Sequence, residues 1–155
     1  MILKGAAIVT EVPVTITITP APAMVSVDLW DEFTPDFGGL TAMRAEPRRW
    51  WVIADEEASE PLEAQLADHG SLTPINGGLM RASLIGAGWR EALMVGGWFD
   101  AESPSFAIGD CVGTLIGHVS VRIQVVSDTQ CDVYFASSYR GAMEHHWQHI
   151  LEPAT

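Results

Sequence analysis

The feature that most constrains this chain is an alternation of apolar and polar residues near its start. Val14, Ile16 and Ile18 alternate with threonines, and Val25, Val27 and Leu29 continue the alternation beyond Pro20-Ala21-Pro22. Successive side chains of a strand point to opposite faces, so the pattern predicts two strands that each bury one face. Proline cannot donate a ladder hydrogen bond, and the prolines at the break place the first strand at a sheet edge or beside a loop. The fold must therefore contain a sheet with one covered face.

The rest of the sequence consists of short apolar runs separated by three amphipathic segments. We expect further strands at residues 40–45, 50–54, 79–85, 112–116, 119–126 and 131–136. We expect helices at residues 59–68, at 89–95, and from Ser137 or Ser138 to about Leu151. This order predicts an α+β fold, a mainly antiparallel sheet with helices on one face. The 155 residues suit a single domain, with an N-terminal arm and strands in residues 1–30.

The charge balance argues against a nucleic-acid partner. The chain has 20 acidic and 8 basic residues and a formal net charge of -12, whereas phosphate contacts need clustered lysine and arginine. Apolar residues make up 48% of the chain, and charged residues only 18%. This ratio predicts an apolar surface that a partner covers.

The two cysteines and the lengths of the apolar runs indicate the cellular compartment of the protein. Cys111 and Cys131 form neither a disulfide framework nor a metal-binding spacing, so we expect two reduced, buried thiols. No apolar run reaches the roughly 18 residues that a bilayer span needs. Residues 2–9 are too short and too interrupted for a secretory signal. The sequence therefore predicts a cytoplasmic protein without a membrane partner.

The densest candidate chemistry lies in the last predicted helix. His145 and His149 are four residues apart, and that spacing on one helical face can bind zinc or nickel. Met143 and Trp147 define the stripe expected to face the core, which places both histidines on the solvated side. Because the segment lacks a third ligand and an HExxH motif, we expect no metal site.

A glycine pair before the second predicted helix is the other candidate for a cofactor loop. Gly86-Ala87-Gly88 follows a strand and begins a helix, as a phosphate-binding loop does. Glu91 occupies the position where a dinucleotide fingerprint has its third glycine, and its charge would repel a pyrophosphate. The chain also has no GxSxG nucleophile motif. We therefore expect no catalytic and no cofactor-binding residue.

The tryptophans indicate an interaction surface. The chain has 6 of them, more than a domain of this length can bury completely. Tryptophan is a preferred anchor in protein interfaces, although about four of these fit ordinary core positions. We name Trp98 and Phe99, which lie in a loop bounded by glycine and proline, as candidate interface residues, together with Trp30.

Four segments resemble one family. They are Trp50-Trp51-Val52-Ile53, residues 79–93 (LMRASLIGAGWREAL), residues 106–116 (FAIGDCVGTLI) and residues 131–139 (CDVYFASSY). In this order they resemble the gamma subunit of heterotetrameric sarcosine oxidase, which is related to the aminomethyltransferase of the glycine cleavage system. The resemblance covers a family-like core of residues 48–152.

The resemblance implies a fold similar to the folate-binding aminomethyltransferase domain. It implies one non-catalytic subunit of a complex with alpha, beta and delta partners, which oxidatively demethylates an N-methyl amino acid such as sarcosine. FAD, FMN, NAD and tetrahydrofolate are then expected on the partner subunits, and none on this chain.

Two other functions stay open on the sequence. The chain could be a stand-alone domain that binds folate or another small molecule, for which Arg81, Asn76 and Arg90 are the available polar residues. It could also be a metal-dependent enzyme built on His145 and His149.

Overall fold

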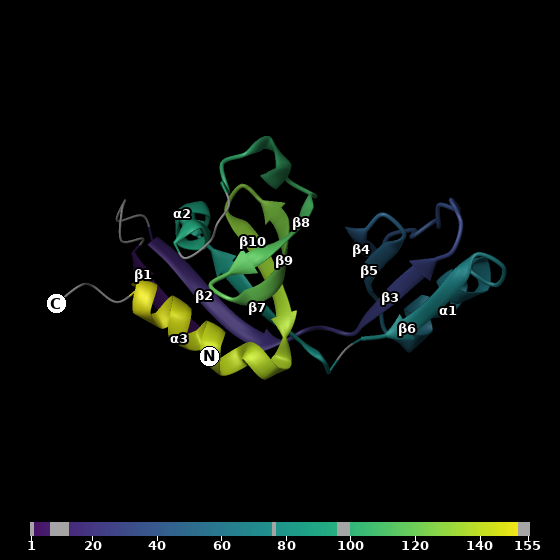
Figure 1. Cartoon of the computed structure of the whole chain (residues 1–155), viewed down its shortest axis with the longest axis horizontal. Helices are drawn as coiled ribbons and strands as arrows, with labels where there is room; N and C mark the ends of the chain where they lie inside the picture. Colours follow the sequence, from purple (N-terminus) through teal and green to yellow (C-terminus); the bar gives the residue numbers. More distant parts are fainter. Residues whose placement is uncertain (1, 7–12, 76, 96–99, 152–155) are drawn as a thin grey trace. The chain divides into compact units, whose positions relative to one another are not determined.

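A computed structural model describes residues 2–6, 13–75, 77–95 and 100–151 (Figure 1). By its internal contacts the chain divides into two compact units, Met1–Pro20 with Leu79–Thr155, and Ala21–Gly78. The larger unit thus joins both ends of the chain, and the smaller one is inserted between them. Each unit is described by itself.

The larger unit is built on a six-stranded sheet. Its strands are β1 (Ile2–Ala6), β2 (Pro13–Pro20), β7 (Leu79–Ile85), β8 (Cys111–Ile116), β9 (Val119–Ser127) and β10 (Gln130–Ala136). They pair antiparallel in the order β1-β2-β7-β10-β9-β8, so β10 lies near the centre of the sheet. The pairing of β2 with β7 connects residues 60 to 70 positions apart in sequence, with Ile16 opposite Leu84.

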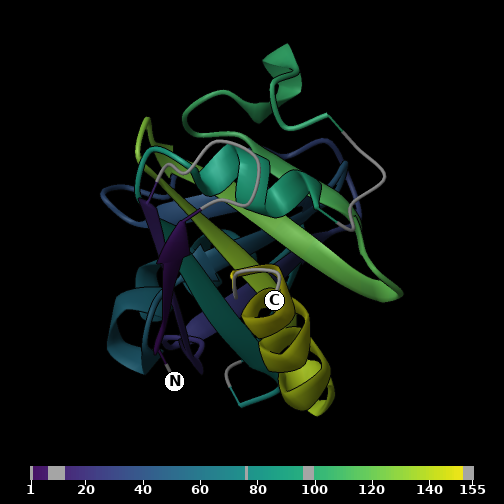
Figure 2. The same cartoon turned by 90° about the vertical axis from the view of Figure 1, so that its left-hand side faces the viewer.

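Two helices cover one face of this sheet, α2 (Trp89–Met94) and α3 (Arg140–Leu151), and Figure 2 shows both on the same side. Trp89 of α2 and Trp147 of α3 are fully buried in one apolar cluster with alternate residues of the central strands. The indole of Trp89 donates a hydrogen bond to the carbonyl of Asp128 at 2.9 Å. We call the face that these helices cover the first face, and the opposite one the second face. Two short 3-10 helices, η1 (Pro104–Phe106) and η2 (Ser137–Tyr139), complete the unit, and η2 leads directly into α3.

A tight hairpin joins β8 to β9. Ile116 and Val119 are paired, so Gly117 and His118 alone make the turn. Gly117 has a φ of 60°, which lies in the left-handed region that glycine adopts without a steric penalty. The glycine and its neighbour therefore fix the register of this hairpin.

The smaller unit is a four-stranded antiparallel sheet with one helix. Its strands are β3 (Met24–Leu29), β4 (Thr41–Glu46), β5 (Arg49–Ile53) and β6 (Gly70–Pro74), in the order β4-β5-β3-β6. The helix is α1 (Glu56–Gln65), whose Leu62 packs with Val27 and Val52 in a second apolar cluster. Asp55 caps this helix, because its carboxylate accepts a hydrogen bond from the backbone N–H of Ala58 at 2.8 Å.

The predicted fold class is confirmed: the chain is α+β with antiparallel sheets. The strands are divided between two sheets, which the sequence pattern did not indicate. Strands β1 and β6 were not predicted, because Ile2–Ala6 does not alternate and Gly70–Pro74 contains few residues that favour strands. The helix expected at residues 59–68 begins earlier, at Glu56, since Asp55 supplies the cap. The single domain over residues 1–155 stays a prediction.

Within the part of the chain that the structure describes, none of the helices has the length and apolar character that crossing a bilayer requires.

Candidate functional site

Among the described residues of the smaller unit, the exposed large hydrophobic side chain is Trp30, directly after β3. Its side chain is 60% exposed, yet its position is fixed by hydrogen bonds. The indole Nε1 donates to the carbonyl oxygen of Asp68 at 3.2 Å, and the backbone N–H donates to the carbonyl oxygen of His69 at 3.0 Å. An exposed indole that is already ordered loses little conformational entropy when a partner covers it.

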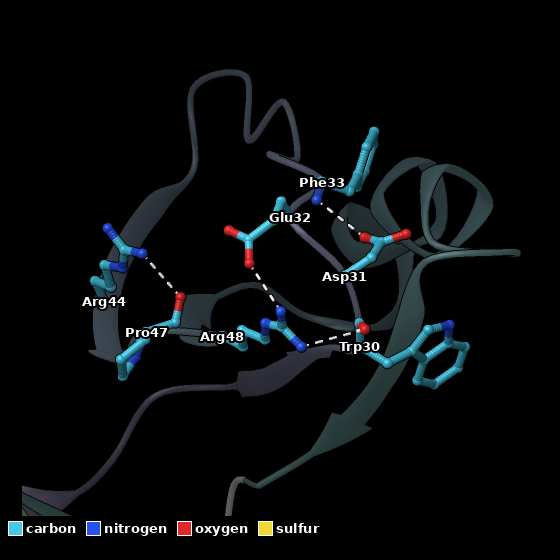
Figure 3. Close-up of polar contacts among 7 residues, drawn as sticks. All are labelled: Trp30, Asp31, Glu32, Phe33, Arg44, Pro47 and Arg48. Atoms are coloured by element: carbon cyan, nitrogen blue, oxygen red, sulfur yellow. Dashed lines mark hydrogen bonds and ion pairs between the residues drawn. The ribbon is translucent and has the colours of Figure 1, made fainter.

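Arg48 holds the backbone on the other side of Trp30. One end of its guanidinium donates to the carbonyl oxygen of Trp30 at 3.3 Å, and the other pairs with the Glu32 carboxylate at 2.8 Å (Figure 3). Nearby, Arg44 donates to the carbonyl oxygen of Pro47 at 2.8 Å and so braces the turn before Arg48 (Figure 3). These contacts give the loop after β3 a defined conformation.

A histidine and an aspartate complete the same surface. Nδ1 of His69 lies 2.7 Å from a carboxylate oxygen of Asp31, whose other oxygen accepts the backbone N–H of Phe33 at 2.9 Å. The ring of Phe33 stacks on the imidazole with 4.1 Å between the centroids. The pKa of Asp31 lies below its ordinary value of 3.8, mainly because His69 and then Phe33 hydrogen-bond to the carboxylate.

We call this set the Trp30 surface. It consists of Trp30, Asp31, Glu32, Phe33, Arg48 and His69. Tryptophan and arginine are the residue types most enriched among energetically dominant interface positions. The arrangement suits the docking of a protein, and the predicted candidate Trp30 is placed at its centre. The sequence reasoning missed the residues that hold Trp30, because their contacts depend on the pairing of β3 with β5 and β6.

The other tryptophans have different environments. Trp89 and Trp147 are fully buried, and Trp50 and Trp51 are half-buried. Trp98 and Phe99, the other two predicted interface residues, lie outside the described residues. Their assignment stays a prediction.

The histidines of α3 lie as the sequence predicted. His145 and His149 are exposed, with ring centroids 6.3 Å apart, while Met143 and Trp147 are buried on the opposite side. His146 is half-buried, and burial lowers the pKa of its imidazole below the ordinary 6.5. Across the described ranges, no three histidine, cysteine or acidic side chains come together as they would around a metal ion.

The residues proposed for a small-molecule pocket do not converge. Arg81 lies on the second face of the six-stranded sheet, whereas Arg90 lies on α2, which covers the first face. The guanidinium of Arg90 lies over the Trp89 ring and donates to the carbonyl oxygen of Ala101. Asn76 falls outside the described residues. Arg81 and Arg90 therefore do not line one pocket, because the sheet separates them.

Both cysteines are free thiols, as expected. Cys131 is buried in the core of the first face, while Cys111 on β8 is half-buried rather than buried. Burial raises the pKa of both thiols above the ordinary 9.0, so neither is an activated nucleophile.

Comparison with known proteins gives matches among solved structures. No protein-family model and no curated protein matches the sequence. Among solved structures, the fold is similar to a chain of the heterotetrameric sarcosine oxidase from Corynebacterium sp. U-96 in complex with pyrrole 2-carboxylate. The TM-score is 0.78 and the identity 12%, over 90% of this chain and 84% of that chain. The two chains thus share a sarcosine-oxidase-like fold along most of their lengths.

Proposed function

We propose that this chain is the small, non-catalytic gamma subunit of a heterotetrameric, sarcosine-oxidase-like flavoenzyme that oxidatively demethylates an N-methyl amino acid. The observation that carries the proposal is the shared fold, which extends over 90% of this chain and 84% of the matched chain. A match of that extent pairs this chain with one whole polypeptide of a four-subunit enzyme. The segments from Trp50 to Tyr139 that resemble the gamma-subunit family add independent support.

In this proposal the redox chemistry takes place on other subunits. The alpha, beta and delta partners bind FAD, FMN, NAD and tetrahydrofolate, and the complex serves sarcosine catabolism and one-carbon metabolism in the cytoplasm. This chain contributes a folded surface that the larger subunits cover. Its high apolar content, 48% of residues, is consistent with such a covered surface.

The Trp30 surface is the proposed point of contact. The exposed Trp30 is flanked by the carboxylates of Asp31 and Glu32, and the whole chain has a net charge of -12. A complementary partner offers an apolar pocket for the indole, surrounded by arginine or lysine side chains. Charges at the rim of such a contact act mainly on the association rate, so we expect association to slow as salt is raised.

Co-expression tests the proposal. The chain would be tagged and produced with the products of the adjacent genes, which we expect to encode two flavoprotein-sized chains and a small cysteine-rich zinc-binding chain. We expect all four chains to co-purify in equal amounts with bound flavin, and this chain alone to be aggregation-prone and to stay monomeric only in dilute solution. Native mass spectrometry and flavin absorbance measure both outcomes.

The same preparation distinguishes the subunit proposal from the alternative function, a stand-alone folate-binding domain. If the chain purifies alone as a stable monomer and none of the neighbouring products associates with it, the subunit proposal is wrong. A rise in melting temperature of that monomer on addition of tetrahydrofolate would then favour a stand-alone folate-binding domain.

A further inference from the structure

Helix α1 and strand β6 of the smaller unit (Figure 1) enclose a hollow of about 540 Å³. Its floor is apolar and comes from the four-stranded sheet and its flanks, whereas its wall is one face of α1. The floor consists of Ala23, Val25, Ala54, Leu72 and Pro74, and the wall of Asp55, Glu56, Ser59, Glu60 and Glu63. We call this hollow the α1–β6 groove. Its volume is in the range of ligand pockets, about 300–1,000 Å³.

The wall of the groove is acidic. Glu56, Glu60 and Glu63 are spaced four and three residues apart, so they project from one face of α1. All three side chains are exposed, and within the described residues none of them forms an ion pair with a basic group of the chain. Carboxylates at this spacing repel one another. A cationic group from outside the chain therefore stabilises this face.

The groove borders the free edge of a sheet. Among the described residues, β6 is the last strand of its sheet and pairs with β3 alone. The Ile75 N–H donates to the carbonyl oxygen of Met24 at 2.9 Å, and the Trp30 N–H donates to that of His69 at 3.0 Å. Hydrogen-bonded pairs alternate along an antiparallel ladder, so the odd-numbered residues of β6 bond to β3. The N–H and the carbonyl of Leu72 therefore point away from β3, where another strand can pair with them.

Charge and extent together select the occupant. Glu56 and Glu63 are separated by two turns of α1, about 10 Å, which corresponds to about three residues of an extended strand. In the described part of the chain no three acidic, histidine or cysteine side chains are close enough to share a metal ion, so a single cation does not account for the wall. A second copy of this chain has the same net charge of -12 and is repelled by it. An extended segment with several positive charges matches both the acidic wall and the free edge.

We propose that an extended segment of a partner protein, with lysine or arginine at alternate positions, pairs antiparallel with β6 and fills the α1–β6 groove. Leu72 exchanges two hydrogen bonds with the residue opposite it, and the side chain of that residue points into the groove, because directly opposite side chains share a face. The methylene groups of a basic side chain at this position cover the apolar floor, while its charged end reaches Glu60 or Glu63. The proposal does not depend on the subunit assignment, since every residue of the groove belongs to the smaller unit.

Synthetic peptides test the pairing on the full chain, held by a tag at low density on a biosensor surface. The parent peptide alternates valine and lysine over about eight residues, and two derivatives carry N-methyl groups on the lysine amides or on the valine amides. With lysine opposite Leu72, the lysine N–H groups face β6 and the valine N–H groups face solvent. We expect methylation of the lysine amides to weaken binding about tenfold and methylation of the valine amides to weaken it less than about threefold. Both derivatives have the charge of the parent peptide, so charge alone predicts no difference.

A pair of double variants tests the acidic wall. We expect Glu60→Gln with Glu63→Gln to weaken binding of the parent peptide about fivefold, and the matched control Glu57→Gln with Glu102→Gln, which removes the same charge outside the groove, to change it less than about twofold. Thermal unfolding checks that both variants are folded, and the methylated peptides test the unmodified chain independently of them. Three results would each overturn the proposal: no binding of the parent peptide, equal effects of the two methylations, or equal losses for the two double variants.

Discussion

The two units of the chain bury their apolar side chains to different extents. In the larger unit, nearly all members of the apolar cluster are fully buried, including Trp89 and Trp147 from the two helices. In the smaller unit, partly buried residues outnumber the fully buried ones, and they include the aromatic residues Phe33, Phe37 and Trp50. The larger unit therefore has a closed core, whereas aromatic side chains of the smaller unit stay partly exposed to solvent.

From this difference we expect the larger unit to contribute most of the stability and the smaller unit to act in recognition. A closed core is costly to change, because close packing leaves no room for rearrangement. The half-open cluster of the smaller unit contributes less to folding, but it supports the loop that presents Trp30. Binding residues commonly lie on loops that a rigid scaffold positions. The following variants test this division of roles.

The largest expected effect is in the core of the larger unit. We predict that Trp147→Ala lowers the free energy of unfolding by about 3–5 kcal/mol, because it leaves a cavity among fully buried side chains. Urea unfolding monitored by circular dichroism measures the loss. Trp147→Phe is the matched control and costs clearly less, since it keeps a ring and removes an indole N–H that has no partner. Equal losses for both variants would contradict the closed-core description.

A smaller effect is expected in the second apolar cluster. We predict that Leu62→Ala on α1 lowers the free energy of unfolding by about 2–3 kcal/mol, near the low end for such changes, because a loosely packed site can collapse around the cavity. Hydrogen exchange should accelerate most for the amides of residues 24–29 and 49–53, which pair in the same sheet. A loss as large as that of Trp147→Ala would remove the distinction between the two cores.

The smallest expected effect is on the stability of the fold at acidic pH. Because the folded chain holds Asp31 with a pKa below 3.8, this group stabilises the fold fully above about pH 3.8 and loses that contribution as pH falls through the lower value. We predict that Asp31→Asn flattens the fall in stability over that range, because the variant is slightly less stable at neutral pH and the difference from the unmodified chain disappears in acid. Urea midpoints from pH 2 to 7 measure this. Glu60→Gln, on the exposed surface of α1, is the control. Identical acid profiles for Asp31→Asn and the unmodified chain would contradict the Asp31–His69 contact.

The sequence predicted what depends on local pattern. The alternation from Val14 to Val27 marked strands correctly, and the spacing of Met143 and Trp147 identified the buried stripe of α3. The high cost of burying six tryptophans pointed to an exposed one, and Trp30 is exposed.

What depends on pairing between distant segments could not be read from the sequence. The division into two sheets follows from β2 pairing with β7 rather than with β3. The pairing of β7 with β10 places Arg81 beside Tyr134, and the β9–β10 register places Arg122 on the other side of Tyr134. Trp30 itself was predicted, but Arg48 and His69, which hold it, come from segments 18 and 38–39 residues away. The spacing of apolar residues along the sequence does not indicate such contacts.

The account depends most on Trp30 acting in recognition and not in folding, and its affinity for the partner subunits tests this directly. The purified partner subunits would be titrated with the unmodified chain and with Trp30→Ala, with Tyr139→Ala as a second exposed aromatic control. We predict that Trp30→Ala weakens binding by at least 30-fold, about 2 kcal/mol, while its unfolding free energy changes by less than about 1 kcal/mol. Unchanged affinity for Trp30→Ala, or the same loss for Tyr139→Ala, would contradict the account.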